Sequence, residues 1–251
     1  MKKFKIKNLL LIAVLLGSLG SCKKILDDVN PGTELDATQM YRDVYDANAA
    51  VMGIYGKFMS LSDRYIILNE LRADLLEYTN NADEYLRQIS HHTVTSDNPY
   101  ASARAFYELI LNCNDVLKNF QIMKDKKTLN TDEFNQRYSD IGALRSFLYL
   151  QLGIHYGEVP YVTEALENIS DIKDPSRFPK LKLDVLLDTL INFTESIPFK
   201  DIYPPDVSNG VSTSLNFTLD GYPTQKFYIN KKNLLGDLHL WKGNYRKAAT
   251  Y

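Results

Sequence analysis

Apolar side chains recur at steps of three and four residues along most of the chain after residue 36. This spacing places them on one face of an α-helix. It predicts five helices, namely Asp36–Phe58, Pro99–Phe120, Thr131–His155, Asp184–Thr194 and a last one that begins near Asn230. Helices therefore dominate the predicted fold.

Residues suited to helix ends stand at the borders of these segments. Asp36 and Thr131 are predicted N-caps, since their side-chain oxygens can accept from free backbone N–H groups of the first turn. Asn98 has the same role before Pro99, a proline suited to a first helical turn. Gly157 stands where a left-handed C-cap is expected, so the third helix ends there.

The segment between the fourth and fifth helices has a different composition. Residues 201–227 are rich in Pro, Gly, Ser and Thr, and they contain Asn209-Gly210 and Asp220-Gly221, which are typical of tight turns. We expect a long loop with room for a small hairpin.

The end of the chain carries small residues at tetratricopeptide spacing. Gly236, Gly243 and Ala248 fall where such a repeat needs close helix contact, a turn and a small buried side chain. A second helix is expected from Asn244 onward. The predicted fold class is all-α, a tetratricopeptide-like superhelix of helix pairs with long loops. Because such pairs bury their faces against neighbours, a chain cut off within a repeat would leave Leu238 and Trp241 poorly covered.

The first 21 residues have the layout of a bacterial export signal. Four lysines precede the eight-residue apolar run 9–16, and Leu19-Gly20-Ser21-Cys22 resembles a lipobox, so residues 1–21 are predicted to be removed and Cys22 lipidated. The run is too short to span a membrane. Residues 22–35 are expected to form a flexible tether. An ordinary signal peptide with an unmodified Cys22 is the alternative.

Charge and cysteine content narrow the class of protein. The chain has 251 residues and a formal net charge of −2, and all four of the lysines before residue 22 belong to the export signal. The remainder is more acidic, which gives no general attraction to nucleic acid. Once Cys22 is lipidated only Cys113 is left, so no intramolecular disulfide can form. Cys113 lies on an apolar helix face and is expected to be a core residue rather than a nucleophile.

No catalytic, metal or cofactor motif is present. The sequence lacks His-Glu-x-x-His, Gly-x-Ser-x-Gly, a phosphate loop and a dinucleotide fingerprint. Glu70, Asp74 and Glu77 could share a helix face, but Arg72 beside them favours ion pairing over acid–base catalysis. His155 follows an apolar face and is expected to pack with its ring satisfied. We therefore expect a protein that is not an enzyme and binds no metal or cofactor.

Several ordered motifs resemble one family. Glu70–Asp74 is similar to its acidic-Leu-Arg-x-Asp signature, and Phe106–Asn114 to its Tyr-x-x-Ile…Asn helix. Ala143–Val162 is similar to an Arg-bearing helix that ends in Tyr-Gly-acidic-Val-Pro, and 243–248 to the following tetratricopeptide. The chain from residue 36 to 251 thus resembles the N-terminal part of the SusD/RagB family of outer-membrane nutrient-binding lipoproteins. Ala103 departs from the family, whose helix often has Trp there.

The resemblance implies a lipid-anchored, surface-exposed scaffold on the outer membrane of Bacteroidetes. Such a protein captures glycan or peptide and sits over a SusC-type TonB-dependent barrel. The family places ligand loops between residues 74 and 99, where this chain offers aromatic and amide side chains for a sugar. The candidate ligand residues are Tyr78, Asn80, Asn81, Tyr85 and Tyr100.

Three alternatives stay open at this point. The tyrosines can be amphipathic packing residues whose hydroxyls reach water. The protein can be a tetratricopeptide-type envelope scaffold or adaptor with no small-molecule site. A glycosidase-like enzyme that uses Glu70 and Asp74 is a third and weaker interpretation.

Overall fold

The computed structural model describes residues 40–166, 173–198, 207–208, 211–212, 215, 218–219, 221–224 and 227–251. Residues from Met40 to Tyr251 form one compact unit. The predicted signal peptide (1–21), the tether (22–35), the lipidated Cys22 and the predicted cap Asp36 lie outside the described residues.

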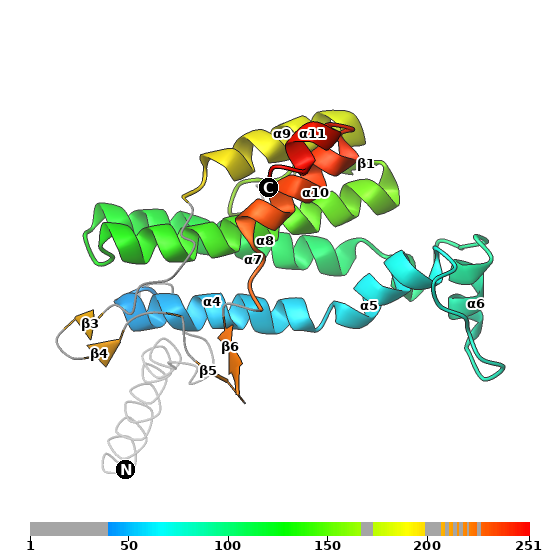
Figure 1. The fold of residues 1–251 in the computed structure, drawn as a ribbon, viewed down its shortest axis with the longest axis horizontal. Coiled ribbons are helices and arrows are strands. Elements are labelled where there is room, and N and C mark those ends of the chain that lie inside the picture. Colours follow the sequence, from blue (N-terminus) through cyan, green and yellow to red (C-terminus); the bar gives the residue numbers. More distant parts are fainter. Residues whose placement is uncertain are drawn as a thin grey trace, which may run out of the picture. The chain divides into compact units, whose positions relative to one another are not determined.

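Successive helices pack against each other along the chain (Figure 1). The elements are α4 (Val44–Met59), α5 (Ser62–Ile66), the π-helix η2 (Ile67–Leu71), α6 (Glu84–Ser90), the 3₁₀ turn η3 (Pro99–Ala101), α7 (Arg104–Asp125), α8 (Thr131–Tyr156), the 3₁₀ turn η5 (Pro175–Arg177), α9 (Leu183–Ser196), α10 (Lys231–Trp241) and α11 (Tyr245–Ala248). Helix α7 packs on α8, α8 on α9, α9 on α10 and α10 on α11. This neighbour-to-neighbour stacking confirms the predicted all-α fold of helix pairs.

Helix α8 is the centre of the core. It contacts α4, α7, α9 and α10, and buried residues occur all around it. Its close approach to α9 depends on Gly153, where an added Cβ would lie only 2.8 Å from Leu186 Cδ2. Cys113 of α7 is fully buried in the same hydrophobic cluster, as predicted. Burial raises the pKa of its thiol to about 12, so it is not a nucleophilic thiolate at neutral pH.

The observed N-caps of α4 and α8 are residues that the sequence analysis did not name. Helix α4 is capped by Asp43, whose side chain accepts from the backbone N–H groups of Tyr45 and Asp46. Helix α8 is capped by Asn130 rather than by Thr131, because Asn130 and Glu133 form a reciprocal capping box that places Thr131 inside the helix. The C-terminal prediction is confirmed, since Gly157 ends α8 with φ of +75°.

The last helix pair agrees with the tetratricopeptide pattern. Asn230 caps α10, and α11 follows directly after Asn244. A Cβ on Gly236 would contact the Ala248 carbonyl oxygen at 3.6 Å, which confirms a close approach of the two helices there. The expectation for Leu238 is wrong, because Leu238 is fully buried, whereas Trp241 is 50% exposed.

Three short antiparallel hairpins accompany the helices. Strand β1 (Glu158–Pro160) pairs with β2 (Lys180–Lys182), a pairing that the sequence did not predict. Two others flank the predicted turn sequences, namely β3 (Val207–Ser208) with β4 (Val211–Ser212) and β5 (Thr218–Leu219) with β6 (Tyr222–Pro223). The loop thus contains two hairpins rather than one.

The segment after α5 is not a regular helix. The π-helix η2 ends at Leu71, and Asp74 has φ of +58°, which a helix cannot include. Glu70, Asp74 and Glu77 therefore do not share a helix face, and the idea of a carboxylate cluster on one helix is wrong.

Candidate ligand-binding site

The candidate ligand residues lie on three short segments at one end of the helical stack (Figure 1). Tyr78, Asn80 and Asn81 belong to the loop 72–83, Tyr85 to α6 and Tyr100 to η3. Helix α6 contacts both η2 and η3, and η2 contacts η3. The fold therefore brings these segments together, although none of them is a long helix.

The loop 72–83 is held against α6. The Tyr78 hydroxyl and His91 Nε2 form a hydrogen bond of 3.0 Å, and their rings are perpendicular with centroids 5.4 Å apart. Arg87 of α6 donates to the Asn80 carbonyl oxygen at 3.0 Å. Asn80 and Asn81 are exposed, so their amides can reach a ligand from a loop that has a fixed base.

Asn98 joins α6 to η3. Its side-chain amide donates to the Tyr85 carbonyl oxygen at 3.0 Å and to Gln88 Oε1 at 3.1 Å, and its Oδ1 accepts from the Tyr100 N–H at 3.0 Å. The residue is only 2% exposed. Asn98 caps η3, whereas the long helix predicted from Pro99 begins only at Arg104. The link of Asn98 to α6 has no signal in the sequence, because it depends on a partner 13 residues away.

Many other tyrosines serve packing, in line with the alternative interpretation. Tyr55 and Tyr149 are buried and donate to the carbonyl oxygens of Asp140 and Val162. Burial raises the pKa of both hydroxyls. Tyr85 and Tyr100 are half-buried, and Tyr100 packs against the core. They can thus present an edge to a ligand while the rest of the ring is held in place.

Four residues that the sequence did not assign to the site gather beside η3. We call Arg64, Arg72, His155 and Tyr156 the arginine corner. Arg64 Nη1 donates to the Ser102 carbonyl oxygen at 3.2 Å, and the Tyr156 hydroxyl donates to the neighbouring Ala101 carbonyl oxygen at 2.9 Å.

His155 is the least satisfied member of this corner. Both of its ring nitrogens are buried and have no hydrogen-bond partner among the described residues, contrary to the expectation of a satisfied ring. Burial, followed by the positive charge of Arg72, lowers the pKa of His155 to about 4. The ring is therefore neutral at physiological pH.

The described residues offer no obvious catalytic chemistry. No group of three His, Cys, Asp or Glu side chains in the described part of the chain could hold a metal ion. Within the same residues, none of the helices has both the length and the apolar character needed to cross a membrane. What the site offers is amide, aromatic and guanidinium groups, which suit binding.

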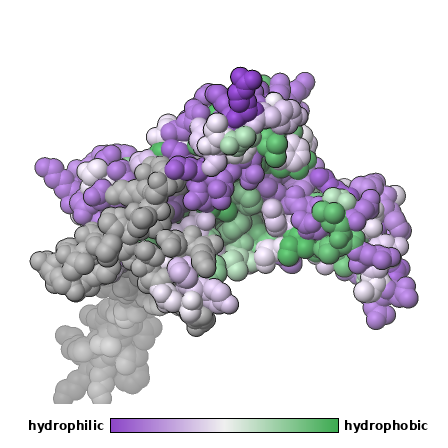
Figure 2. Space-filling model, in the orientation of Figure 1, coloured by the Kyte–Doolittle hydropathy of each residue, from purple (hydrophilic) through white to green (hydrophobic). Residues whose placement is uncertain are grey.

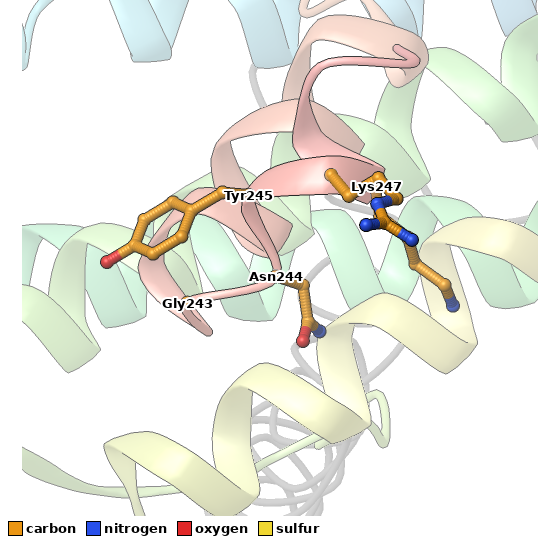
Figure 3. Close-up of a pocket in the computed structure, with 5 residues that line it drawn as sticks. Gly243, Asn244, Tyr245 and Lys247 are labelled. Carbon is orange, nitrogen blue, oxygen red and sulfur yellow. The ribbon is translucent and has the colours of Figure 1, made fainter.

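Two shallow hollows lie elsewhere on the molecule. One of about 460 Å³ is formed by Gly243–Lys247 at the α10–α11 turn, where the Tyr245 ring points away from Asn244 and Lys247 (Figure 3). The other, of about 480 Å³, lies between α7 and β2 and includes Tyr107 and Phe178. Neither hollow contains any of the candidate ligand residues.

The end of α5 and the loop 72–83 carry exposed apolar side chains. Ile66, Leu75 and Leu76 are 46%, 69% and 48% exposed. Figure 2 shows hydrophobic surface at the end of the molecule where α5 lies.

Comparisons with known proteins agree with this geometry. No family model matches the chain. A SusD-like protein of Formosa agariphila, SusD-like protein P2, is 26% identical over 99% of this chain and 45% of its own length. The solved structure of a laminarin-binding SusD-like protein matches 84% of this chain and 42% of its own with a TM-score of 0.60 and 15% identity. A SusD-like carbohydrate-binding protein of Bacteroides vulgatus matches 83% and 44% with a TM-score of 0.57 and 18% identity.

The chain thus spans less than half the length of these relatives. The names of the two solved structures describe a laminarin-binding and a carbohydrate-binding protein. The resemblance read from the motifs is confirmed: over the part that it spans, this chain is similar in sequence and in fold to SusD-like proteins.

Proposed function

We propose that this protein is a non-catalytic lipoprotein of the outer membrane that binds glycans at the cell surface and delivers them to a SusC-type TonB-dependent transporter. The observation that carries the proposal is the SusD-like fold with exposed amides and half-buried tyrosines gathered at one end. Relatives whose names state laminarin or carbohydrate binding share this fold.

The chemistry of the site supports a sugar ligand. Sugar rings present apolar C–H faces and a rim of hydroxyl groups, so they need flat aromatic surface together with hydrogen-bonding side chains. Tyr85 and Tyr100 supply aromatic surface, and Asn80 and Asn81 supply hydrogen-bonding amides. Because Asn98 fixes α6 against η3 through three hydrogen bonds, the two tyrosines are held in place before a ligand arrives.

Glycan binding is tested by affinity electrophoresis of the full chain in gels that contain laminarin, starch, plant or host glycans. We expect at least one glycan to retard the protein, and Asn81→Ala with Tyr85→Ala to remove most of the retardation. Tyr45→Ala is the matched control, since Tyr45 is 51% exposed on α4 and lies outside the site. No retardation by any glycan would remove the sugar assignment.

Anchoring is proposed to depend on Cys22. Its thiol would take a thioether-linked lipid, and several acyl chains hold a protein far more firmly than one. Cys22→Ser is expected to move the protein from the membrane fraction to a soluble pool, whereas Cys113→Ala leaves it in the membrane. Digestion of intact cells with a protease tests surface exposure, because only an outward-facing protein is cleaved.

A second candidate function is an envelope adaptor without a small-molecule site. The observation that favours it is the exposed apolar surface of the last helix pair, where Leu240, Trp241 and Tyr245 are 53%, 50% and 69% exposed. Co-purification with a barrel protein together with no binding to any glycan would support the adaptor. Glycan binding that is lost in the Asn81 and Tyr85 variants would exclude it.

A further inference from the structure

The arginine corner contains two guanidinium groups that form no ion pair within the described part of the chain. Arg64 and Arg72 are half-buried, and neither forms an ion pair with an acidic side chain of the described residues. The only side-chain hydrogen bond of Arg64 within this part of the chain goes to the Ser102 carbonyl oxygen. Partly burying an arginine without a counter-charge costs stability, so such groups point to a role other than folding.

The two arginines lie around one place. Arg64 Nη1 and the Tyr156 hydroxyl bind the adjacent carbonyl oxygens of Ser102 and Ala101. Asn69, one turn before Arg72, donates to Gln151 Oε1 at 3.0 Å, and this bond holds η2 against the last turns of α8. In agreement with this placement, both arginines act on Tyr156 and lower the pKa of its hydroxyl, although burial raises it more strongly.

This place is next to the candidate ligand residues. Tyr100 directly precedes Ala101 in η3, whose carbonyl oxygen Tyr156 binds. Arg72 directly follows η2 and begins the loop that carries Asn80 and Asn81. A ligand seated on Tyr100 would therefore lie two residues from the carbonyl oxygen that binds Arg64.

We propose that the glycan bound here carries an acidic group, a carboxylate or a sulfate, which Arg64 and Arg72 bind through charge-assisted hydrogen bonds. The inference rests on the proposed function, since it names the class of glycan that the same site takes. Guanidinium groups match planar carboxylates and sulfates because their N–H groups form a rigid fork. The neutral His155 ring adds no charge of its own to the corner.

Acidic residues near the arginine corner limit how the site can select an acidic glycan over a neutral one. Asp63, Glu70, Asp74 and Glu77 all lie on α5, η2 or the loop 72–83, so they reduce the positive potential around the two arginines. Long-range attraction of a polyanion is therefore not expected. Selectivity has to come from direct contact of the acidic group with the guanidinium groups, which salt screens much less than it screens charges in open solvent.

The test compares three oligosaccharide classes on the full chain by calorimetry at 0.15 M salt. They are uronate oligomers from alginate, sulfated carrageenan oligomers and neutral laminarin oligomers. The variants are Arg64→Gln, Arg72→Gln and the charge-retaining Arg72→Lys. Arg42→Gln is the control, because Arg42 is an exposed arginine that pairs with Asp46 at 2.9 Å at the start of α4.

We expect an acidic class to bind more tightly than laminarin, and each Arg→Gln change to weaken it by about tenfold or more. Arg72→Lys should recover part of the loss, and Arg42→Gln should have no effect. If the uronate oligomers bind more tightly, the arginines bind a carboxylate; if the carrageenan oligomers do, they bind a sulfate. Melting curves identify any variant that fails to fold. If Arg72→Gln fails, Arg64→Gln tests the same contact from a separate position.

Two results would overturn the inference in different ways. Equal or tighter binding of laminarin, unchanged in both Arg→Gln variants, would refute the acidic ligand but keep the glycan-binding function. Failure of all three classes, and of every glycan in the affinity gels, would remove the proposed function itself.

Discussion

His155 is expected to make the stability of the protein depend on pH. In an unfolded chain its pKa is near 6.5, whereas in the folded protein burial and Arg72 lower it to about 4. Between these two values the unfolded chain binds a proton that the folded protein does not. Stability from this residue is therefore complete above about pH 6.5, is lost as the pH falls toward 4, and changes no further below 4.

The size of the effect follows from the pKa difference. One pKa unit corresponds to about 1.4 kcal/mol, so the full difference is about 3 kcal/mol. Because His155 is only half-buried, solvent screening reduces this value, and we expect about 2 kcal/mol. A change of that size is a large fraction of the stability of a typical domain.

The measurement is urea unfolding followed by circular dichroism at steps from pH 7 to pH 4 and constant ionic strength. His155→Phe keeps an aromatic ring but cannot titrate, so the difference in unfolding free energy between variant and parent should grow by about 2 kcal/mol across this range. His92→Asn is the control, since His92 is exposed and asparagine tolerates its φ of +56°. Parallel curves of unfolding free energy against pH for His155→Phe and the parent would show that folding does not lower the pKa of His155.

Four further predictions concern helix packing, a buried hydrogen-bond link and the buried thiol. Gly153→Ala should destabilise the protein by about 1–3 kcal/mol in urea unfolding, because the new methyl group would meet Leu186 at 2.8 Å. Gly53→Ala, at an α4 position with open space around it, should instead stabilise by about 0.5–1 kcal/mol, and the opposite sign would contradict the contact geometry. Asn98→Ala should cost about 1–3 kcal/mol and speed amide exchange in α6 and η3, since it removes hydrogen bonds to the Tyr85 carbonyl oxygen, Gln88 Oε1 and the Tyr100 N–H. Cys113 should resist thiol reagents until the protein unfolds, as mass spectrometry of its peptide would show, because its thiol is buried and its pKa is about 12.

The long helices could be predicted from the sequence because their signals are local and repeated. Residues such as Phe106, Ile110 and Leu148 recur at helical spacing, and all of them are buried. The error in the N-cap of α8 also has a local cause. Asn130 and Thr131 are both good caps, and only the reciprocal contact with Glu133 decides between them.

The candidate site was less predictable because its geometry depends on contacts between distant segments. The loop that carries Tyr78 and Asn81 could be assigned by resemblance, but α5, η2 and α6 have too few residues for a periodic pattern. Arg64 and His155 are separated by 91 positions in the sequence, and only the packing of η2 and η3 on the end of α8 relates them. No motif marks an arginine that lacks a carboxylate partner.

The π-turn Ile67–Leu71 has a consequence for how such a site can change over evolutionary time. A π-turn holds one residue more than the α-helix around it, and each residue turns the following chain by roughly 100° about the helix axis. Deleting one residue there would rotate Arg72 about the helix axis and away from the end of α8. The four residues of the arginine corner would themselves be unchanged. If the site binds acidic glycans as proposed, gain or loss of one codon would change its ligand selectivity although none of its residues is substituted.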